Sequence, residues 1–293
     1  MQPEIDLLGL PLKTFGIMFA LGFIASGAVI HRRMKELQIP GDWAYEMIFS
    51  ALIGGLVGAR LFWVIENPDR VKGAADLVGG TGLVWYGGVL GGALFVVLWA
   101  RWRGWLGVTM FDVAAVPLAL GNAIGRIGCQ LSGDGDYGKA WNGPWAMGYP
   151  HGTVPTDPGV TVHPTPIYET LAMGLIAWFL WTLRDRVRPG VLFALWLILA
   201  GLERLLIEFL RRNPVEAIGL TLPQLQSVAM IAGGLVWIAL VRRRHGSALL
   251  PRDEPYPGVA LPAAASSPDP LPATPGSCRR YSKRRSPIAA RRC

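Results

Sequence analysis

Residues 83–100 read LVWYGGVLGGALFVVLWA and contain no charged side chain. An apolar stretch of about 20 residues is long enough to cross a bilayer as a helix. Further stretches of this kind span 12–30, 44–65, 112–131, 166–183, 191–210 and 222–241. The stretch at 112–131 is the weakest, because Pro117, Asn122 and Arg126 interrupt it. We therefore predict an all-α, polytopic membrane protein with seven transmembrane helices.

The composition supports this class and excludes others. Of the 293 residues, 52% are hydrophobic and 16% are charged, whereas a soluble domain carries roughly 25% charged residues. A water-soluble enzyme is therefore close to excluded. The net charge of +8 comes mainly from residues 245–293, where eight Lys/Arg and three acids give +5, so no nucleic-acid partner is indicated. Three cysteines and four histidines lack the spacing of a zinc site, and we expect no metal.

The charged loops predict an orientation. Lys and Arg follow the first, third, fifth and seventh predicted spans, whereas acidic residues mark the N-terminus and the outer loop 132–165. Short loops rich in Lys and Arg stay in the cytoplasm, so we expect the N-terminus outside and the C-terminus cytoplasmic. Residues 1–244 would form the transmembrane domain. The Pro-, Ala- and Ser-rich basic tail 245–293 would be disordered.

Polar side chains of several predicted spans lie close to the outer edge of the bilayer. At ~1.5 Å per residue, Arg60, Arg126 and Arg204 fall within ~10 Å of that edge. Charged groups at such depth are costly and usually functional, and Arg binds phosphate with two donors at once. We therefore predict an anion site for a phospholipid headgroup. Other polar residues at this level are Tyr86, His163, Tyr168, Glu169, Glu208 and Arg211.

The same arginines also have a structural interpretation. Arg60 could pair with Glu66, and Arg204 with Glu203 or Glu208, as ion pairs that only hold helices together. A single arginine would fit either interpretation equally well. The convergence of three favours function.

Residues 125–138 read GRIGCQLSGDGDYG, a Gly-rich stretch that begins inside the predicted membrane region. Non-helical backbone at that depth is tolerated only around a cavity, so we expect this stretch to line one. Its Cys129 is expected to pack rather than to react. Glycines repeated at helical spacing in 54–58 and 87–92 predict close packing of two helices.

Several short motifs of this sequence, in the order in which they occur, resemble motifs of the bacterial prolipoprotein diacylglyceryl transferases. The family's Gly-Arg-x-Gly-Asn-x-x-Asn-Gly-Glu-type signature corresponds to residues 125–134, and its His-Pro-x-x-x-Tyr-Glu box to residues 163–169. A Phe-Arg-x-x-x-Glu-Phe-x-Arg box corresponds to 203–211, and a Gly-Leu-Thr-x-x-Gln box to 219–224. The resemblance covers about 10–244. The departures are Tyr86 for His in the family's His-Gly-Gly motif, Cys129 and Ser132 for Asn, Asp134 for Glu, and Phe15 for Tyr.

The resemblance implies an activity, transfer of the diacylglyceryl group of phosphatidylglycerol to the lipobox cysteine thiol of a preprolipoprotein. A thioether would form and glycerol phosphate would leave. The implied partners are phosphatidylglycerol, preprolipoprotein signal peptides and membrane lipid, and no cofactor is implied. The implied location is the bacterial inner membrane, with the active site toward the outer leaflet.

The resemblance also implies residue roles. Arg126 and Arg204 would hold the departing phosphate, with Arg60 as a supporting charge. The base is open between Tyr86 and His163. Asp134 and Glu208 would orient the arginines, and the remaining substrate-binding candidates are Gly133, Tyr168, Glu169 and Arg211.

Two other functions stay open from the sequence alone. The first is an outward-facing lipid or anion transporter, which would need polar residues in the cytoplasmic half of the helices. That half is almost wholly apolar. The second is a paralogue that binds lipid but lost activity through Tyr86.

Overall fold

The computed structural model describes residues 2–7, 10–70, 84–214, 219–251, 254 and 256–257. These ranges contain seven long helices, one short 3-10 helix and one hairpin. The helices are α1 (Thr14–Glu36), α2 (Trp43–Glu66), η1 (Pro68–Arg70), α4 (Trp85–Trp102), α5 (Val108–Ser132), α6 (Thr165–Leu183), α7 (Val191–Glu208) and α8 (Leu222–His245). The strands are β1 (Glu4–Leu7) and β2 (Leu10–Lys13). Most of the predicted tail 245–293 lies outside the described residues.

The N-terminal hairpin corrects the prediction of a purely helical chain. β1 and β2 pair antiparallel, with Glu4 opposite Lys13 and Ile5 opposite Leu12. The first helix therefore begins at Thr14 rather than at residue 12, because strand pairing already occupies the backbone before it. The Thr14 backbone N–H donates to the Pro3 carbonyl at 2.9 Å, which joins the hairpin to the start of α1.

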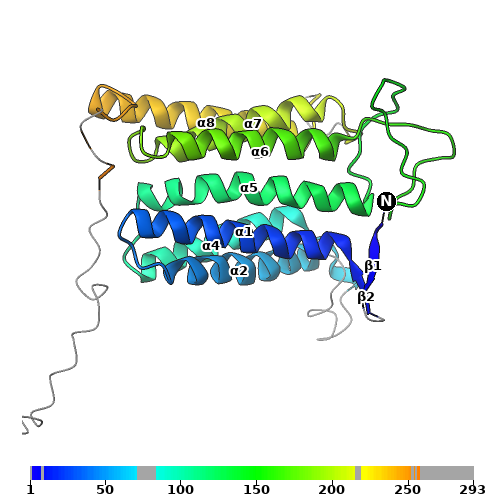
Figure 1. Ribbon diagram of the computed structural model, residues 1–293, viewed down its shortest axis with the longest axis horizontal. Helices are drawn as coiled ribbons and strands as arrows, with labels where there is room; N and C mark the ends of the chain where they lie inside the picture. Colours follow the sequence, from blue (N-terminus) through cyan, green and yellow to red (C-terminus); the bar gives the residue numbers. More distant parts are fainter. Residues whose placement is uncertain are drawn as a thin grey trace, which may run out of the picture. The chain divides into compact units, whose positions relative to one another are not determined.

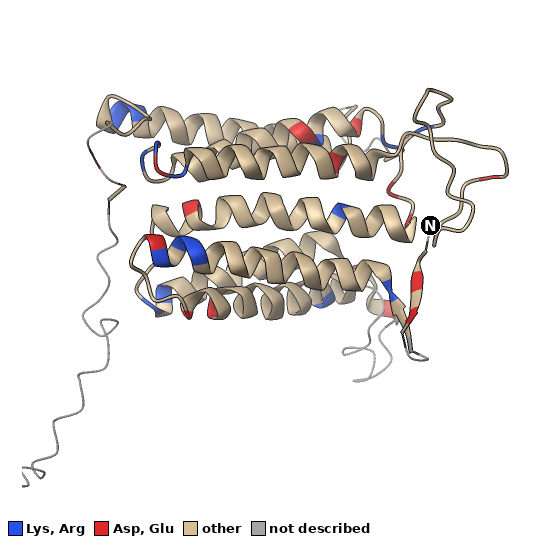
Figure 2. Cartoon of the chain, viewed as in Figure 1, with Lys and Arg blue, Asp and Glu red and all other residues tan. Residues whose placement is uncertain are grey.

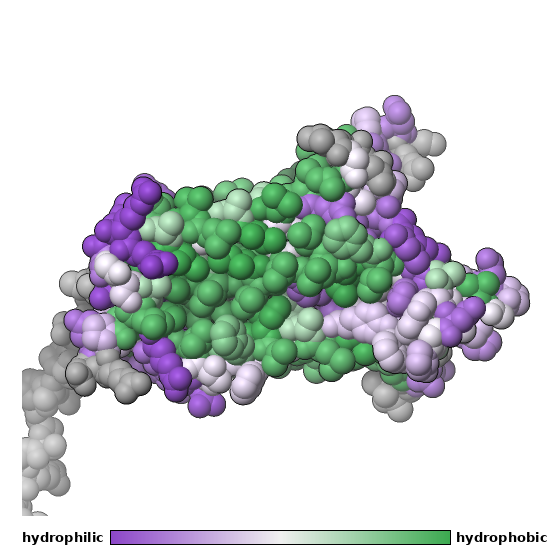
Figure 3. Space-filling model, turned by 90° about the horizontal axis from the view of Figure 1, so that it is seen from above, coloured by the Kyte–Doolittle hydropathy of each residue, from purple (hydrophilic) through white to green (hydrophobic). Residues whose placement is uncertain are grey.

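The outer surface of the helices is apolar. Large side chains such as Ile24, Ile65 and Leu90 point outward and are more than half exposed, and Figure 3 shows a continuous hydrophobic belt between two polar ends. By length and composition, α1, α2, α5, α6 and α8 could each cross a membrane. α4 and α7 are not among these five helices, and α7 carries the charged residues Glu203, Arg204 and Glu208 within its last six positions. An exposed apolar belt of this extent is a lipid-facing surface, so the chain is a polytopic membrane protein.

The helices pack around α5, which contacts α1, α6 and α7, while α2 pairs with α4 and α7 with α8 (Figure 1). α5 is continuous from Val108 to Ser132. The expectation of non-helical backbone from residue 125 onward is therefore wrong as far as Ser132. Pro117 does lack a backbone donor, but neighbouring helices cover it, and the Ser26 hydroxyl of α1 donates to its carbonyl at 3.1 Å. Such neighbours are what make proline tolerable in membrane helices.

Glycines bring α2 and α4 into close contact, as their spacing predicted. A Cβ added at Gly58 would lie 2.7 Å from the Cα of Gly91, and a Cβ added at Gly91 would lie 2.7 Å from the Cα of Gly58. Gly54 and Gly87 are equally confined. Only hydrogen side chains allow the two backbones to approach this far.

Charged residues gather at the two ends of the bundle (Figure 2). At one end, Arg33 in the last turn of α1 pairs with Asp185 at 2.6 Å, and Arg184 pairs with Glu36 at 3.1 Å. The chain after α8 folds back there, where the Arg188 N–H donates to the Ala248 carbonyl at 3.0 Å. The opposite end holds the hairpin and the loop 133–164 (Figure 1).

Candidate functional site

Three arginines come together near the end of the bundle that holds the hairpin. Arg126 lies on α5, Arg204 on α7, and Arg211 follows the end of α7. Their common partner is Glu169 on α6, which is only 2% exposed. Glu169 forms ion pairs with Arg126, with Arg204 at 3.4 Å and with Arg211 at 3.4 Å. One buried carboxylate on α6 therefore holds three guanidiniums, one from α5 and two from the end of α7 and the residues just after it.

Two further carboxylates complete this cluster. Asp136, in the loop after α5, pairs with Arg126 and Arg211. Glu208 on α7 pairs with Arg204 at 2.9 Å. The formal charges of Glu169, Asp136 and Glu208 thus balance those of the three arginines. We call these six residues the arginine cluster.

The turn after α5 brings Asp136 to the arginines. Gly133 ends the helix with φ of 58°, and Gly135 follows with φ of 94°, a left-handed backbone that favours glycine. A Cβ at Gly133 would also lie 2.7 Å from the Cα of Gly152. Gly133, a predicted substrate-binding residue, therefore shapes the site through its backbone.

Glu208 links the cluster to α8. Its carboxylate accepts hydrogen bonds from the Thr221 hydroxyl at 2.7 Å and from the Asn213 amide at 2.8 Å. Thr221 is also the N-cap of α8 and forms a capping box with Gln224. The box at residues 219–224 therefore holds Glu208 in place.

The arginines keep donors free for another ligand. The side chains of Arg126 and Arg204 are 19% and 23% exposed. Within the described part of the chain, no hydrogen bond uses Nη2 of Arg126 or Nε of Arg204. A guanidinium binds phosphate through several N–H groups, and these unused N–H groups are the ones that a bound anion would contact.

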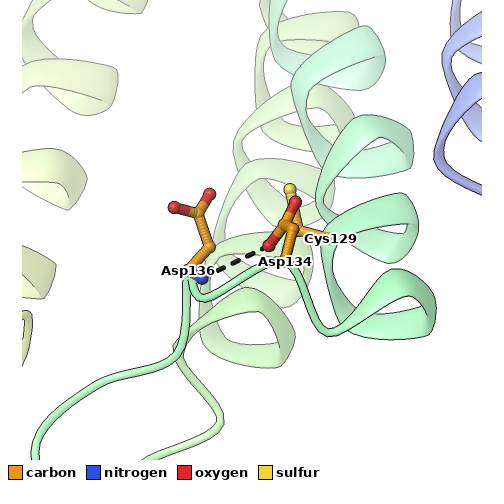
Figure 4. Close-up of side chains that lie close together, drawn as sticks. All are labelled: Cys129, Asp134 and Asp136. Atoms are coloured by element: carbon orange, nitrogen blue, oxygen red, sulfur yellow. Dashed lines mark hydrogen bonds between the residues drawn. The ribbon is translucent and has the colours of Figure 1, made fainter. Parts of the chain in front are cut away.

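Cys129, Asp134 and Asp136 lie together at the end of α5 (Figure 4), with one potential ligand atom of each within 4.8 Å of the others. Asp134 accepts a hydrogen bond from the Asp136 backbone N–H at 3.2 Å. A cation here would compete with Arg126 and Arg211 for Asp136. The trio therefore fits a cation poorly, and Cys129 is buried against the helix end.

The two aspartates differ in protonation. Burial and the neighbouring charge of Asp136 raise the pKa of Asp134 above its ordinary value. Burial also acts to raise the pKa of Asp136, but the charges of Arg126 and Arg211 outweigh it and hold that pKa below its ordinary value. Asp136 is therefore the firmly ionised member of the pair.

Of the box at residues 163–169, Glu169 belongs to the arginine cluster, whereas His163 and Tyr168 have other partners. His163 stacks on Trp141 with ring centroids 4.3 Å apart, and its Nδ1 is buried without a hydrogen-bond partner among the described residues. Tyr168 accepts a hydrogen bond from the Trp145 indole at 2.6 Å. Of this box, Glu169 alone forms an ion pair with the arginines in the described part of the chain.

Arg60 and Tyr86 belong to the α2–α4 pair. The Arg60 guanidinium lies over the Trp63 ring, 4.3 Å from its centroid, and the Tyr86 ring lies 5.1 Å from that of Trp85. This helix pair packs on the rest of the bundle chiefly through α1. Arg60 and Tyr86 thus come from α2 and α4, whereas the arginine cluster is built from α5, α6, α7 and the residues that follow α5 and α7.

Sequence reasoning missed Asp136. It expected Asp134 to orient the arginines, but Asp136 contacts Arg126 and Arg211. Both aspartates lie in the same Gly-rich turn, and nothing in their spacing distinguishes them. The backbone angles of Gly133 and Gly135 decide which carboxylate faces the arginines.

Comparison with known proteins assigns the family. Residues 4–240 match the family model described as prolipoprotein diacylglyceryl transferase. The chain is 34% identical over 224 residues to the phosphatidylglycerol–prolipoprotein diacylglyceryl transferase of Clostridium tetani, covering 73% of this chain and 87% of that protein. It is 32% identical to the enzyme of that name from Leptospira interrogans, covering 69% and 72%, and 31% identical to that of Geobacter sulfurreducens, covering 83% and 96%. The resemblance seen in the sequence motifs is thus confirmed, and the chain belongs to the prolipoprotein diacylglyceryl transferase family.

Proposed function

We propose that this protein transfers the diacylglyceryl group of phosphatidylglycerol to the lipobox cysteine thiol of a preprolipoprotein. Family membership and the names of its relatives support this activity. The observation that carries the proposal is the convergence of Arg126, Arg204 and Arg211 on Glu169 with donors left over. This arrangement suits an anionic lipid headgroup at the edge of an apolar bundle.

The reaction makes two demands on the protein. The thiol must lose its proton, because the thiolate is the nucleophile. The sulfur then bonds to the glyceryl carbon as the carbon–oxygen bond breaks, and glycerol phosphate leaves with that electron pair. Arg126 and Arg204 hold this phosphate as its charge grows, and donors that are already in place need no reorganisation during the reaction. Glu169, Asp136 and Glu208 hold the two guanidiniums in position, and Arg211 pairs with Asp136 and Glu169.

The remaining candidates take supporting roles in this proposal. Arg60 adds positive charge from α2, and Tyr86 donates a hydrogen bond to the phosphate or relays a proton. His163 and Tyr168 lie at the entrance of α6, where the signal peptide approaches from the outer loop. Substrate cysteines reach the arginines from that side.

We further propose that all seven long helices span the bacterial inner membrane, with the N-terminus outside and the arginine cluster toward the outer leaflet. The Lys- and Arg-rich ends of α1, α4, α6 and α8 support this orientation, because such ends stay in the cytoplasm. α7 spans although it carries Glu203, Arg204 and Glu208, because these ionisable residues face the bundle interior rather than lipid, and Arg204 and Glu208 pair with each other there.

The test is genetic and biochemical. The gene should rescue a bacterium depleted of its own diacylglyceryl transferase, and the purified protein should lipidate a lipobox peptide from phosphatidylglycerol vesicles. Arg126→Gln should abolish both, whereas Arg243→Gln, at the exposed opposite end, should abolish neither. A well-expressed parent chain without transfer activity would refute the proposal and favour a lipid-binding paralogue.

A further inference from the structure

Glu203 is a buried acid that the arginine cluster does not use. It lies on α7 directly before Arg204 and is 9% exposed. Its Oε1 is buried without a hydrogen-bond partner, and within the described ranges its carboxylate forms neither a hydrogen bond nor an ion pair. Buried carboxylates are normally paired. An unpaired one beside a cluster of ions therefore calls for a function.

Charged groups face Glu203 from the elements around it. These are Arg126 on α5, Glu169 on α6, Arg204 on α7 itself and Arg211 just beyond it. The charged residues of α8, the remaining neighbour, lie in its last turn at the other end of the bundle. The surroundings of Glu203 are therefore the arginine cluster, whose own charges already balance.

This balance decides how Glu203 responds to the lipid. As an ionised group it adds one negative charge to a neutral cluster, and the phosphate of phosphatidylglycerol adds another. Like charges within a poorly hydrated site disfavour ionisation of both. The diester phosphate cannot take up a proton near neutral pH, so the bound lipid favours the neutral acid of Glu203.

We propose that Glu203 is the proton acceptor for the substrate thiol, and that binding of the lipid phosphate prepares it for this task. The proposal rests on the transferase function above. The S–H proton passes to the Glu203 carboxylate, and the sulfur bonds to the glyceryl carbon. The carbon–oxygen electron pair leaves with glycerol phosphate, which takes the proton from Glu203 on departure. The exposed part of Glu203 is where the thiol reaches it.

Asp134 is the rival acceptor within the site. It also lies outside the balanced ion pairs, and burial and Asp136 raise its pKa. It differs from Glu203 because it accepts the Asp136 backbone N–H and lies against Cys129. A carboxylate already engaged as an acceptor is the poorer base, so the observations favour Glu203.

The test compares Glu203→Gln with Glu203→Asp in steady-state transfer from phosphatidylglycerol vesicles to a lipobox peptide. General-base removal should lower kcat about 100-fold, while KM for the lipid stays equal or falls, because a negative charge has been removed. The decline of kcat at acidic pH should disappear in Glu203→Gln, and Glu203→Asp should restore part of the rate.

The matched control is Glu46→Gln on α2. The Glu46 carboxylate accepts hydrogen bonds from Arg103 and Trp99 at the opposite end of the bundle. Its loss should leave kcat within about two-fold of the parent value.

The other possible results separate a failure of this inference from a failure of the proposed transferase function. If the parent chain transfers lipid and Glu203→Gln keeps its kcat and pH profile, the inference is wrong and the function stands. If both Glu203 variants unfold or lose lipid binding, the role is structural and the inference is also wrong. If Asp134→Asn, His163→Gln or Tyr86→Phe removes the acidic decline instead, that residue is the acceptor. A parent chain without any transfer overturns the proposed function itself.

Discussion

Arg126 is the residue on which the site depends most, because it joins two carboxylates from different segments. It pairs with Glu169 of α6 and Asp136 of the following loop, and it still keeps Nη2 for a ligand. Lysine offers a point charge without this fork of donors. Arg126→Lys should therefore lower kcat/KM by about 100-fold or more, as does loss of one preorganised donor in other enzymes. Steady-state assays on vesicles would measure it, and near-parental activity would remove Arg126 from the phosphate site.

Asp136 should make stability depend on acid pH. Its pKa is lowered in the folded protein, although burial opposes this, because Arg126 and Arg211 stabilise its ionised form. A group with a depressed folded pKa contributes stability above its unfolded pKa, near 3.8, and loses it as pH falls through the folded value. Asp136→Asn should thus lower Tm at pH 5–8, and the difference from the parent should shrink below about pH 4. A difference that grows on acidification would contradict this assignment.

For single residues, the sequence predicted which side chains belong to the arginine cluster better than it predicted which ion pairs they form. Arg126, Arg204 and Glu169 are predicted from the sequence because charged side chains inside a membrane are costly and usually functional. The alternative of structural pairing proved partly right, since Arg204 does pair with Glu208. Asp136 could not be distinguished from Asp134, because two turn glycines set its direction.

Among the elements, the α2–α4 contact should be sensitive to a single methyl group. A Cβ at Gly58 would meet backbone atoms of α4, including Gly91 Cα at 2.7 Å, and backbone cannot move aside cheaply. Gly58→Ala should destabilise the protein by about 1–3 kcal/mol. The control is Gly174→Ala on α6, where a Cβ meets nothing within 4 Å. Thermal unfolding in detergent should show a lower Tm for Gly58→Ala alone, and equal Tm values would disprove the close packing.

The segment after α8 should stabilise the opposite end of the bundle. The Tyr256 hydroxyl donates to Asp112 of α5 at 2.9 Å, and Asp112 also accepts the backbone N–H groups of Gly190 and Phe193 at the start of α7. Tyr256→Phe removes one hydrogen bond to a charged group and should cost about 1.5–3 kcal/mol. Denaturant unfolding monitored by tryptophan fluorescence would measure this loss. An unchanged midpoint would mean that Tyr256 is dispensable.

The apolar stretches of the sequence predicted the positions of the helices well, but they predicted the helix ends less accurately. The stretch at 112–131 looked weakest, yet α5 is the central helix, since contacts with α1, α6 and α7 compensate for its proline and polar residues. The hairpin was missed because residues 4–13 depend on pairing with each other. Pairing of that kind leaves little periodic signal in so short a segment.

For the whole molecule, the proposed orientation gives a direct test. In a background with Cys129, Cys278 and Cys293 replaced by Ser, Trp145→Cys in the outer loop should react with an impermeant maleimide in intact spheroplasts. Arg243→Cys, in the last turn of α8, should react only after lysis. The reverse pattern would invert the topology and place the arginine cluster at the cytoplasmic face.

The arrangement of the helix ends in the whole chain was predicted better than the contacts of single residues. Apolar stretches and alternating basic loops determine which helix ends lie together, and Arg33–Asp185 and Arg184–Glu36 join the expected ends. What the sequence left open was the order of neighbours around α5. Helices embedded in lipid differ little in hydrophobicity on their several faces, so side-chain packing decides that order.

The shared anchoring of three guanidiniums by Glu169 has an evolutionary corollary. Substitution of any one of these residues leaves an unpaired charge in the apolar interior of the bundle. Single replacements at positions 126, 169, 204 and 211 should therefore be selected against. Drift in this quartet is expected to proceed by concerted, charge-compensating changes. An alignment of many relatives would reveal it as covariation among these four columns.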